Sequence, residues 1–137
     1  MIQKIDHIGI AVKSLEKWNH FYGEVLGFEY QGEEEVPSQG VRVSFFSVGE
    51  IKIELLMPLH EDSNVAKFLQ QKGEGIHHIA YFVEGGSDHL TNCLATIKAE
   101  GFIPIHEIPI EGAHHKKIAF LHPKHTGGTL IELCTFE

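Results

Sequence analysis

Two histidines and two glutamates stand at equivalent places in two similar stretches of this chain. The segment around His7 recurs 71 residues later around His78, and an Ile-Glu-Leu triplet centred on Glu54 recurs 78 residues later at Glu132. Internal repeats of this kind indicate two copies of one structural unit. Two imidazoles and two carboxylates suit a borderline divalent cation such as Zn²⁺, Co²⁺, Mn²⁺, Ni²⁺ or Fe²⁺. The repeats therefore predict one metal site with four ligands.

The alternation of side chains along a strand selects which histidine belongs to this site. His7 shares a face with Gly9, and His78 shares a face with Ala80, so a small residue leaves space beside each imidazole. His77 has the opposite parity to His78 and is expected to face the other side of the strand. The sequence therefore favours His78 over His77 as a ligand.

The two glutamates interrupt apolar strands, where an unpaired carboxylate would be costly. The alternative is that each strand has one wet face, so that the four polar residues only point to water. Recurrence of both the histidine and the glutamate at matching positions favours the metal site.

These residues must be positioned by two β-α-β-β-β modules in tandem, an α+β fold. Module one covers about residues 4–58, a linker with a short helix covers 59–75, and module two covers about 76–136. At 137 residues the chain is expected to form a single domain, residues 1–137. Ser14 and Ser87 are expected to cap the long helix of each module. The apolar positions of the first helix are Leu15, Trp18, Phe21, Tyr22 and Val25. The predicted strands are 5–12, 28–36, 41–48 and 51–57 in module one, and 76–83, 102–108, 116–121 and 129–135 in module two.

Composition excludes several classes of function. The net charge of -8 argues against a nucleic-acid-binding protein, which needs a basic surface. No apolar run approaches the roughly 20 residues that span a bilayer, and the N-terminus lacks a signal-peptide pattern. The two cysteines, Cys93 and Cys134, are too few for a disulfide framework. We expect a cytoplasmic protein without membrane attachment.

With this set of residues the sequence resembles the vicinal oxygen chelate superfamily, also called the glyoxalase/bleomycin resistance/dioxygenase superfamily. Within it the resemblance is strongest to the methylmalonyl-CoA epimerase family and covers essentially the whole chain. The matching segments are residues 6–12, 37–41, 53–59, 73–80, 118–124 and 126–133. The resemblance implies a curved mixed sheet formed by the two modules, and a homodimer.

The resemblance also implies roles for individual residues. His7, Glu54, His78 and Glu132 would hold the metal, and the substrate would be an acyl-CoA thioester whose C2 proton is removed and replaced. A cation that stabilises the enolate would supply Lewis-acid catalysis. Glu132 is the candidate for one acid/base group.

Inversion at C2 needs a second acid/base group on the other face. Some family members have a glutamate on the third strand, where this chain has Val43, which cannot transfer a proton. Glu34, Glu35, Glu50 or a bound water remain as alternatives.

Three lysines are the available cations for the phosphates of CoA: Lys116, Lys117 and Lys124. The simpler alternative is a solvated basic loop. His115 lies in the same loop, at a position where relatives often have glycine.

Other activities of the same fold remain as alternatives. A glyoxalase I type lactoylglutathione lyase uses the same four ligands, but the turn at residues 122–128 favours the epimerase. An extradiol dioxygenase uses two histidines and one carboxylate, so Glu54 counts against it. A non-catalytic binding protein of this fold commonly lacks the ligands that this chain keeps.

Overall fold

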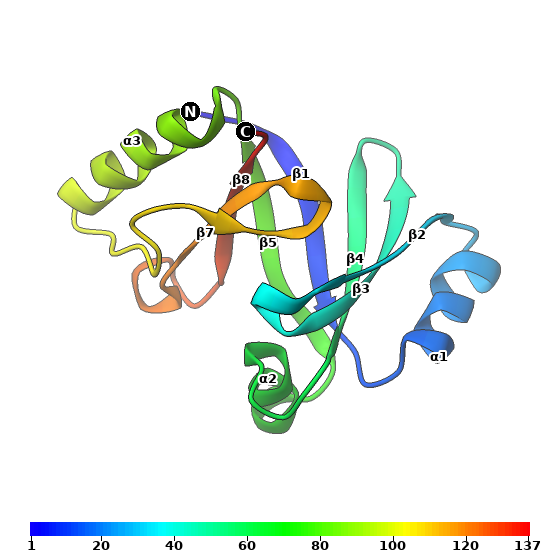
Figure 1. Ribbon diagram of the computed structural model, residues 1–137. Coiled ribbons are helices and arrows are strands. Elements are labelled where there is room, and N and C mark those ends of the chain that lie inside the picture. Colours follow the sequence, from blue (N-terminus) through cyan, green and yellow to red (C-terminus); the bar gives the residue numbers. More distant parts are fainter. The chain divides into compact units, whose positions relative to one another are not determined.

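The computed structural model describes all 137 residues and divides into two compact units. The N-terminal unit is residues 7–77, and the C-terminal unit is residues 1–6 together with 78–137. The chain therefore passes between the units inside its first strand, β1 (Ile2–Ala11), and again inside β5 (Gly75–Val83) (Figure 1).

The N-terminal unit follows the predicted β-α-β-β-β order. Its elements after β1 are α1 (Leu15–Asn19), β2 (Glu29–Val36), β3 (Val41–Val48), β4 (Ile51–Pro58) and α2 (Asn64–Lys72). β2, β3 and β4 form an antiparallel meander, and β1 pairs with β4 in parallel. The predicted strands 41–48 and 51–57 are confirmed, and the linker contains the expected short helix.

One face of this sheet packs against α1 and the helical segment that follows it (Figure 1). Val12, Leu15, Phe46 and Leu55 form the buried centre of that packing. Ser14 caps α1 as predicted, because its hydroxyl accepts a hydrogen bond from the Lys17 amide at 3.3 Å.

The first helix does not stay α-helical to its end. Residues His20–Val25 form a π-helical segment, in which the Leu26 amide donates to the Phe21 carbonyl. The wider turn rotates the last side chains away from the core, so Val25 is exposed although its spacing predicted an inner position.

The C-terminal unit repeats the order with β5, α3 (Gly86–Ala99), β6 (Ile110–Glu111), β7 (Lys117–Leu121) and β8 (Ile131–Thr135). β5 and β8 are parallel, and β8, β7 and β6 are antiparallel neighbours. The start of β1 joins this unit, since Lys4 lies over the Phe82 ring and Gln3 donates to Glu84. α3 covers one face of the sheet (Figure 1), with a core of Val83, Leu90, Cys93, Leu94, Ala119, Leu121 and Leu133.

Two local predictions for this unit are wrong. α3 begins at Gly86 rather than behind a Ser87 cap, because the Gly86 amide finds its acceptor in the Thr135 hydroxyl at 3.2 Å. The predicted strand 102–108 contributes only an isolated bridge between Pro104 and Leu121. Pro104 has no amide hydrogen, and the Phe120 amide donates to the side chain of His106 instead of a carbonyl, so a regular ladder does not form.

The α+β class and the two tandem modules are confirmed. None of the helices combines the length and the apolar character needed to cross a membrane. That the two units make one domain stays a prediction.

Candidate active site

In the N-terminal unit, His7 and Glu54 face each other on neighbouring strands. β1 and β4 are parallel, and their register places Gly9 beside Glu54, so the glycine leaves that face open next to the carboxylate. His7 Nδ1 lies 3.1 Å from Glu54 Oε2, and the two side chains are only 5% and 7% exposed. A histidine and a carboxylate are therefore held together where water has little access.

The C-terminal unit contains an equivalent pair. Glu132 of β8 is the register partner of Ala80 on β5, and His78 Nε2 lies 3.4 Å from Glu132 Oε1. Both side chains are buried. The ring of Phe120 meets the His78 imidazole edge to face at 5.6 Å and fixes its orientation. The equivalence that the repeats predicted extends to the histidine–glutamate contact in each unit.

The geometry of each pair fits metal ligation. Nitrogen and oxygen ligands lie about 2.1 Å from Zn²⁺ or a similar ion, so two ligands at 90–109° around it are about 3.0–3.4 Å apart. The observed separations, 3.1 Å and 3.4 Å, fall within that range. All four side chains are buried, and each could offer one ligand atom to a cation.

His77 lies on the other side of its strand, as the alternation predicts. Its ring packs edge to face against Phe68 of α2 at 5.0 Å. Burial lowers the pKa of His77 to about 4, so the imidazole is neutral at physiological pH.

Among the three predicted CoA-binding lysines, Lys116 is buried. Its ammonium lies 2.7 Å from Asp6 Oδ2 and 5.6 Å above the ring of Phe136. Lys117 pairs with Glu111 and lies 3.6 Å from Glu137. Lys124 is exposed in a single helical turn, Pro123–His125. Lys124 is therefore the most accessible of the three, and Lys116 the least.

The loop before Lys116 carries backbone strain. His114 and His115 have φ values of 56° and 58°, in the left-handed region that glycine adopts without cost. A glycine at the His115 position, which the resemblance led us to expect, would adopt this conformation without cost.

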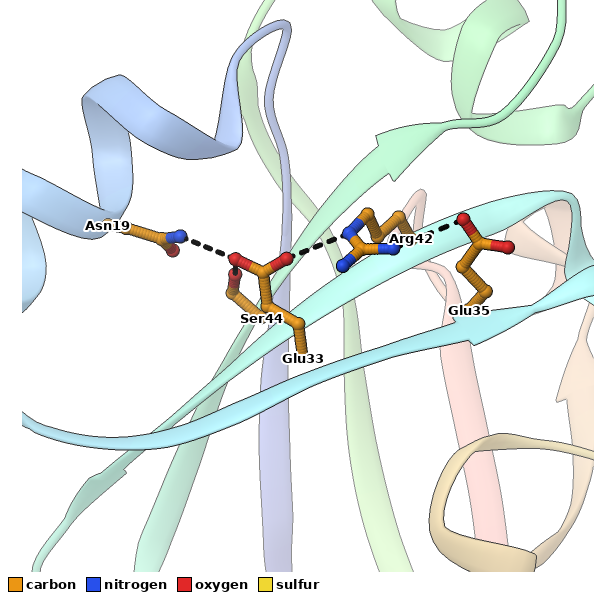
Figure 2. A network of polar contacts seen from close by, with 5 residues as sticks. All are labelled: Asn19, Glu33, Glu35, Arg42 and Ser44. Carbon is orange, nitrogen blue, oxygen red and sulfur yellow. Dashed lines mark hydrogen bonds and ion pairs between the residues drawn. The ribbon is translucent and has the colours of Figure 1, made fainter.

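A polar network that the sequence analysis missed lies on the α1 side of the N-terminal sheet. Figure 2 shows Glu33 accepting hydrogen bonds from Asn19, Arg42 and Ser44, while Arg42 also reaches Glu35. Burial raises the pKa of Glu33, but these hydrogen bonds outweigh it and leave the pKa lowered. The sequence signal for this network was the alternation of Glu33 and Glu35 opposite Arg42. That signal can be recognised only when the register between the two strands is known.

His106 is a second residue that the sequence did not single out. Its Nδ1 accepts from the Phe120 amide at 3.3 Å, and its ring lies 6.0 Å from that of Phe120, the residue that packs on His78. Burial lowers the pKa of His106. It lies in a segment that was predicted to be a strand, so no sequence signal marked it.

Comparison with known proteins agrees with this architecture. Residues 6–120 match the Glyoxalase/Bleomycin resistance protein/Dioxygenase superfamily. The chain is 40% identical to human mitochondrial methylmalonyl-CoA epimerase, over 95% of this chain and 72% of the relative. It is also 40% identical to the ethylmalonyl-CoA/methylmalonyl-CoA epimerase of Cereibacter sphaeroides, over 97% of this chain and 98% of the relative.

A solved structure is also similar to this chain. Streptomyces coelicolor methylmalonyl-CoA epimerase, in complex with 2-nitronate-propionyl-CoA, superposes with a TM-score of 0.92 at 36% identity. The match covers 99% of this chain and 96% of that one.

The chain belongs to the Glyoxalase/Bleomycin resistance protein/Dioxygenase superfamily and has its α+β fold. Its relatives within the superfamily include methylmalonyl-CoA epimerases, and this chain is accordingly an isomerase of the epimerase type.

Proposed function

We propose that this protein epimerises methylmalonyl-CoA at C2 and that it does so with one divalent cation held by His7, Glu54, His78 and Glu132. One observation carries the proposal: each unit of this chain has a buried histidine–glutamate pair whose nitrogen–oxygen distance fits two ligands of one metal ion. The chain is also a relative of known epimerases. Zn²⁺, Co²⁺, Mn²⁺, Ni²⁺ and Fe²⁺ all suit this donor set.

A cation bound there would act as a Lewis acid, stabilising the negative charge that develops on the substrate when the C2 proton leaves. The protein's own residues supply the rest of the chemistry. Phe120 holds the His78 ring in place, and Glu132 is the proposed acid/base group on one face of C2. The buried surroundings of both pairs would strengthen electrostatic interactions with the substrate.

The acyl-CoA substrate is supported by the relatives' names and by the CoA derivative in the Streptomyces coelicolor structure. For the CoA phosphates we propose Lys124 first and Lys117 second. Lys116 can contribute only if its contact with Asp6 rearranges. A homodimer and a cytoplasmic location stay predictions.

The test is an isotope exchange measurement on protein loaded with each candidate metal. With methylmalonyl-CoA in D₂O, deuterium should enter C2 as the two epimers equilibrate, and metal-free protein should not catalyse this. Ethylmalonyl-CoA, assayed in parallel, measures the substrate range. Turnover of the methylglyoxal–glutathione hemithioacetal without any exchange would replace the epimerase with a glyoxalase. Inactivity toward all three substrates would point to a binding protein.

A further inference from the structure

Three consecutive glutamates lie on β2, and the strand register separates the middle one from its neighbours. Glu34 is paired with Val43 of β3, whereas Glu35 is paired with Arg42, one position along. Directly opposed residues share a face of an antiparallel sheet, and successive residues alternate. Glu34 therefore lies on the opposite face from Glu33 and Glu35.

The two outer glutamates are engaged on the α1 side. Figure 2 shows Glu33 bonded to Asn19 and Ser44, and both Glu33 and Glu35 reach Arg42. Glu50 is exposed in the tight turn between β3 and β4. Glu33 and Glu35 therefore do not lie on the face that carries the histidine–glutamate pair, and Glu50 lies in a turn outside the paired strands.

Glu34 does share that face. Across β3, Val43 is opposed by Leu56, and Phe45 is opposed by Glu54, so Glu34, Val43, Phe45 and Glu54 all lie on one side of the sheet. Two strand spacings of about 4.8 Å and a shift of two residues place the backbones of Glu34 and Glu54 about 12 Å apart. At that separation, two extended side chains can flank a small group lying above Val43.

We infer that Glu34 is the second acid/base group of the epimerisation, taking the role that Val43 cannot perform. This inference rests on the proposed function. Glu132 accepts the C2 proton as the C–H bond breaks, and the electron pair moves onto the thioester oxygen. That pair then returns to C2, where a proton from protonated Glu34 forms the new C–H bond on the opposite face. The proton has moved from Glu34 to Glu132, and reverse turnover or exchange with water restores the starting state.

The experiment compares Glu34→Gln with Glu35→Gln, a matched change one residue away on the opposite face. Each enzyme is given each pure epimer of methylmalonyl-CoA in D₂O, and epimerisation and C2 deuteration are followed separately. Glu34→Gln should epimerise about 10²–10⁴-fold more slowly. It should still exchange the C2 proton of the epimer that Glu132 deprotonates, within about tenfold of the wild-type rate. Glu35→Gln should stay within about threefold of wild type in both readouts.

Epimerisation by Glu34→Gln within about fivefold of wild type would overturn the assignment. Loss of exchange with both epimers would also overturn it, because removal of one base leaves the other face active. Glu34→Asp keeps a carboxylate, so it should retain more epimerase activity than the glutamine variant, and an equal loss would count against the role. Thermal unfolding midpoints identify any variant that fails to fold. If the wild-type protein shows neither exchange nor epimerisation, the proposed function itself is wrong. If both the wild type and Glu34→Gln are active, only the role assigned to Glu34 is wrong.

Discussion

Replacement of Lys116 with methionine removes one half of a buried ion pair and should strongly destabilise the protein. The Lys116 ammonium lies 2.7 Å from Asp6 Oδ2, and the side chains are 6% and 8% exposed. At an effective dielectric constant of about 20, that separation corresponds to about 6 kcal/mol of Coulomb attraction. Part of this attraction only offsets the cost of desolvating the two charges. Lys116→Met leaves the Asp6 carboxylate buried without its cation, so the free energy of unfolding should fall by about 3–5 kcal/mol.

Urea unfolding at neutral pH measures the loss. The control is Lys117→Met, whose partner Glu111 is largely exposed, and which should lose far less stability than Lys116→Met. The double variant Asp6→Asn/Lys116→Met removes the stranded charge and should recover most of the stability lost by Lys116→Met. A loss below about 1 kcal/mol for Lys116→Met would refute the assignment of Lys116 to a structural pair and return it to the candidates for CoA binding.

Three further changes test other parts of the structure. His78→Ala should abolish metal binding, measured by metal content after dialysis, with little change in the unfolding midpoint. Replacement of the exposed His20 with alanine is the control. Full metal content in His78→Ala would exclude His78 as a ligand. Glu33→Gln should reduce stability at pH 7. Because the pKa of Glu33 is lowered in the folded state, the stability that Glu33 contributes is lost as pH falls below the ordinary pKa of 4.5. The difference in stability between wild type and Glu33→Gln should therefore be smaller near pH 3 than at pH 7. An equal difference at both pH values would contradict the lowered pKa. Ser63→Ala leaves the buried Ala66 amide without its acceptor at 3.1 Å and should cost about 0.5–2 kcal/mol in urea unfolding. The loss should exceed that of Ser14→Ala, whose capping hydrogen bond is longer and more exposed. The reverse order would argue against burial as the cause.

The strands that carry the proposed ligands could be predicted from the sequence. Their apolar runs, the turn residues that bound them and the isolated histidines and glutamates within them all indicate the same strand positions. β3 was predicted to the residue, and glycines with positive φ, Gly40 and Gly49, bound it at both ends. The choice of His78 over His77 needed only the alternation of side chains, and His77 does pack away from Glu132, against Phe68.

The misses share a physical cause, which is competition from partners distant in sequence. Thr135 sets the start of α3 from 49 residues away, and His106 takes an amide hydrogen that a strand would have used. Lys116 looked like a surface cation because its partner, Asp6, lies 110 residues earlier. The glutamates of β2 could not be sorted by sequence, because their faces depend on the register with β3.

The passage of the chain between units inside β1 has a consequence for folding kinetics. Residues 1–6 belong with residues 78–137, so the C-terminal unit cannot be completed until β8 has been made. Its Asp6–Lys116 contact closes a loop of 110 residues, and contacts at such separations slow folding because chain entropy is lost before they form. Residues 7–77, by contrast, are continuous in sequence and can fold first on the ribosome. A fragment that begins at residue 75 would lack both the first strand segment and the counter-ion of Lys116, so it should refold only when a peptide of residues 1–6 or the rest of the chain is supplied.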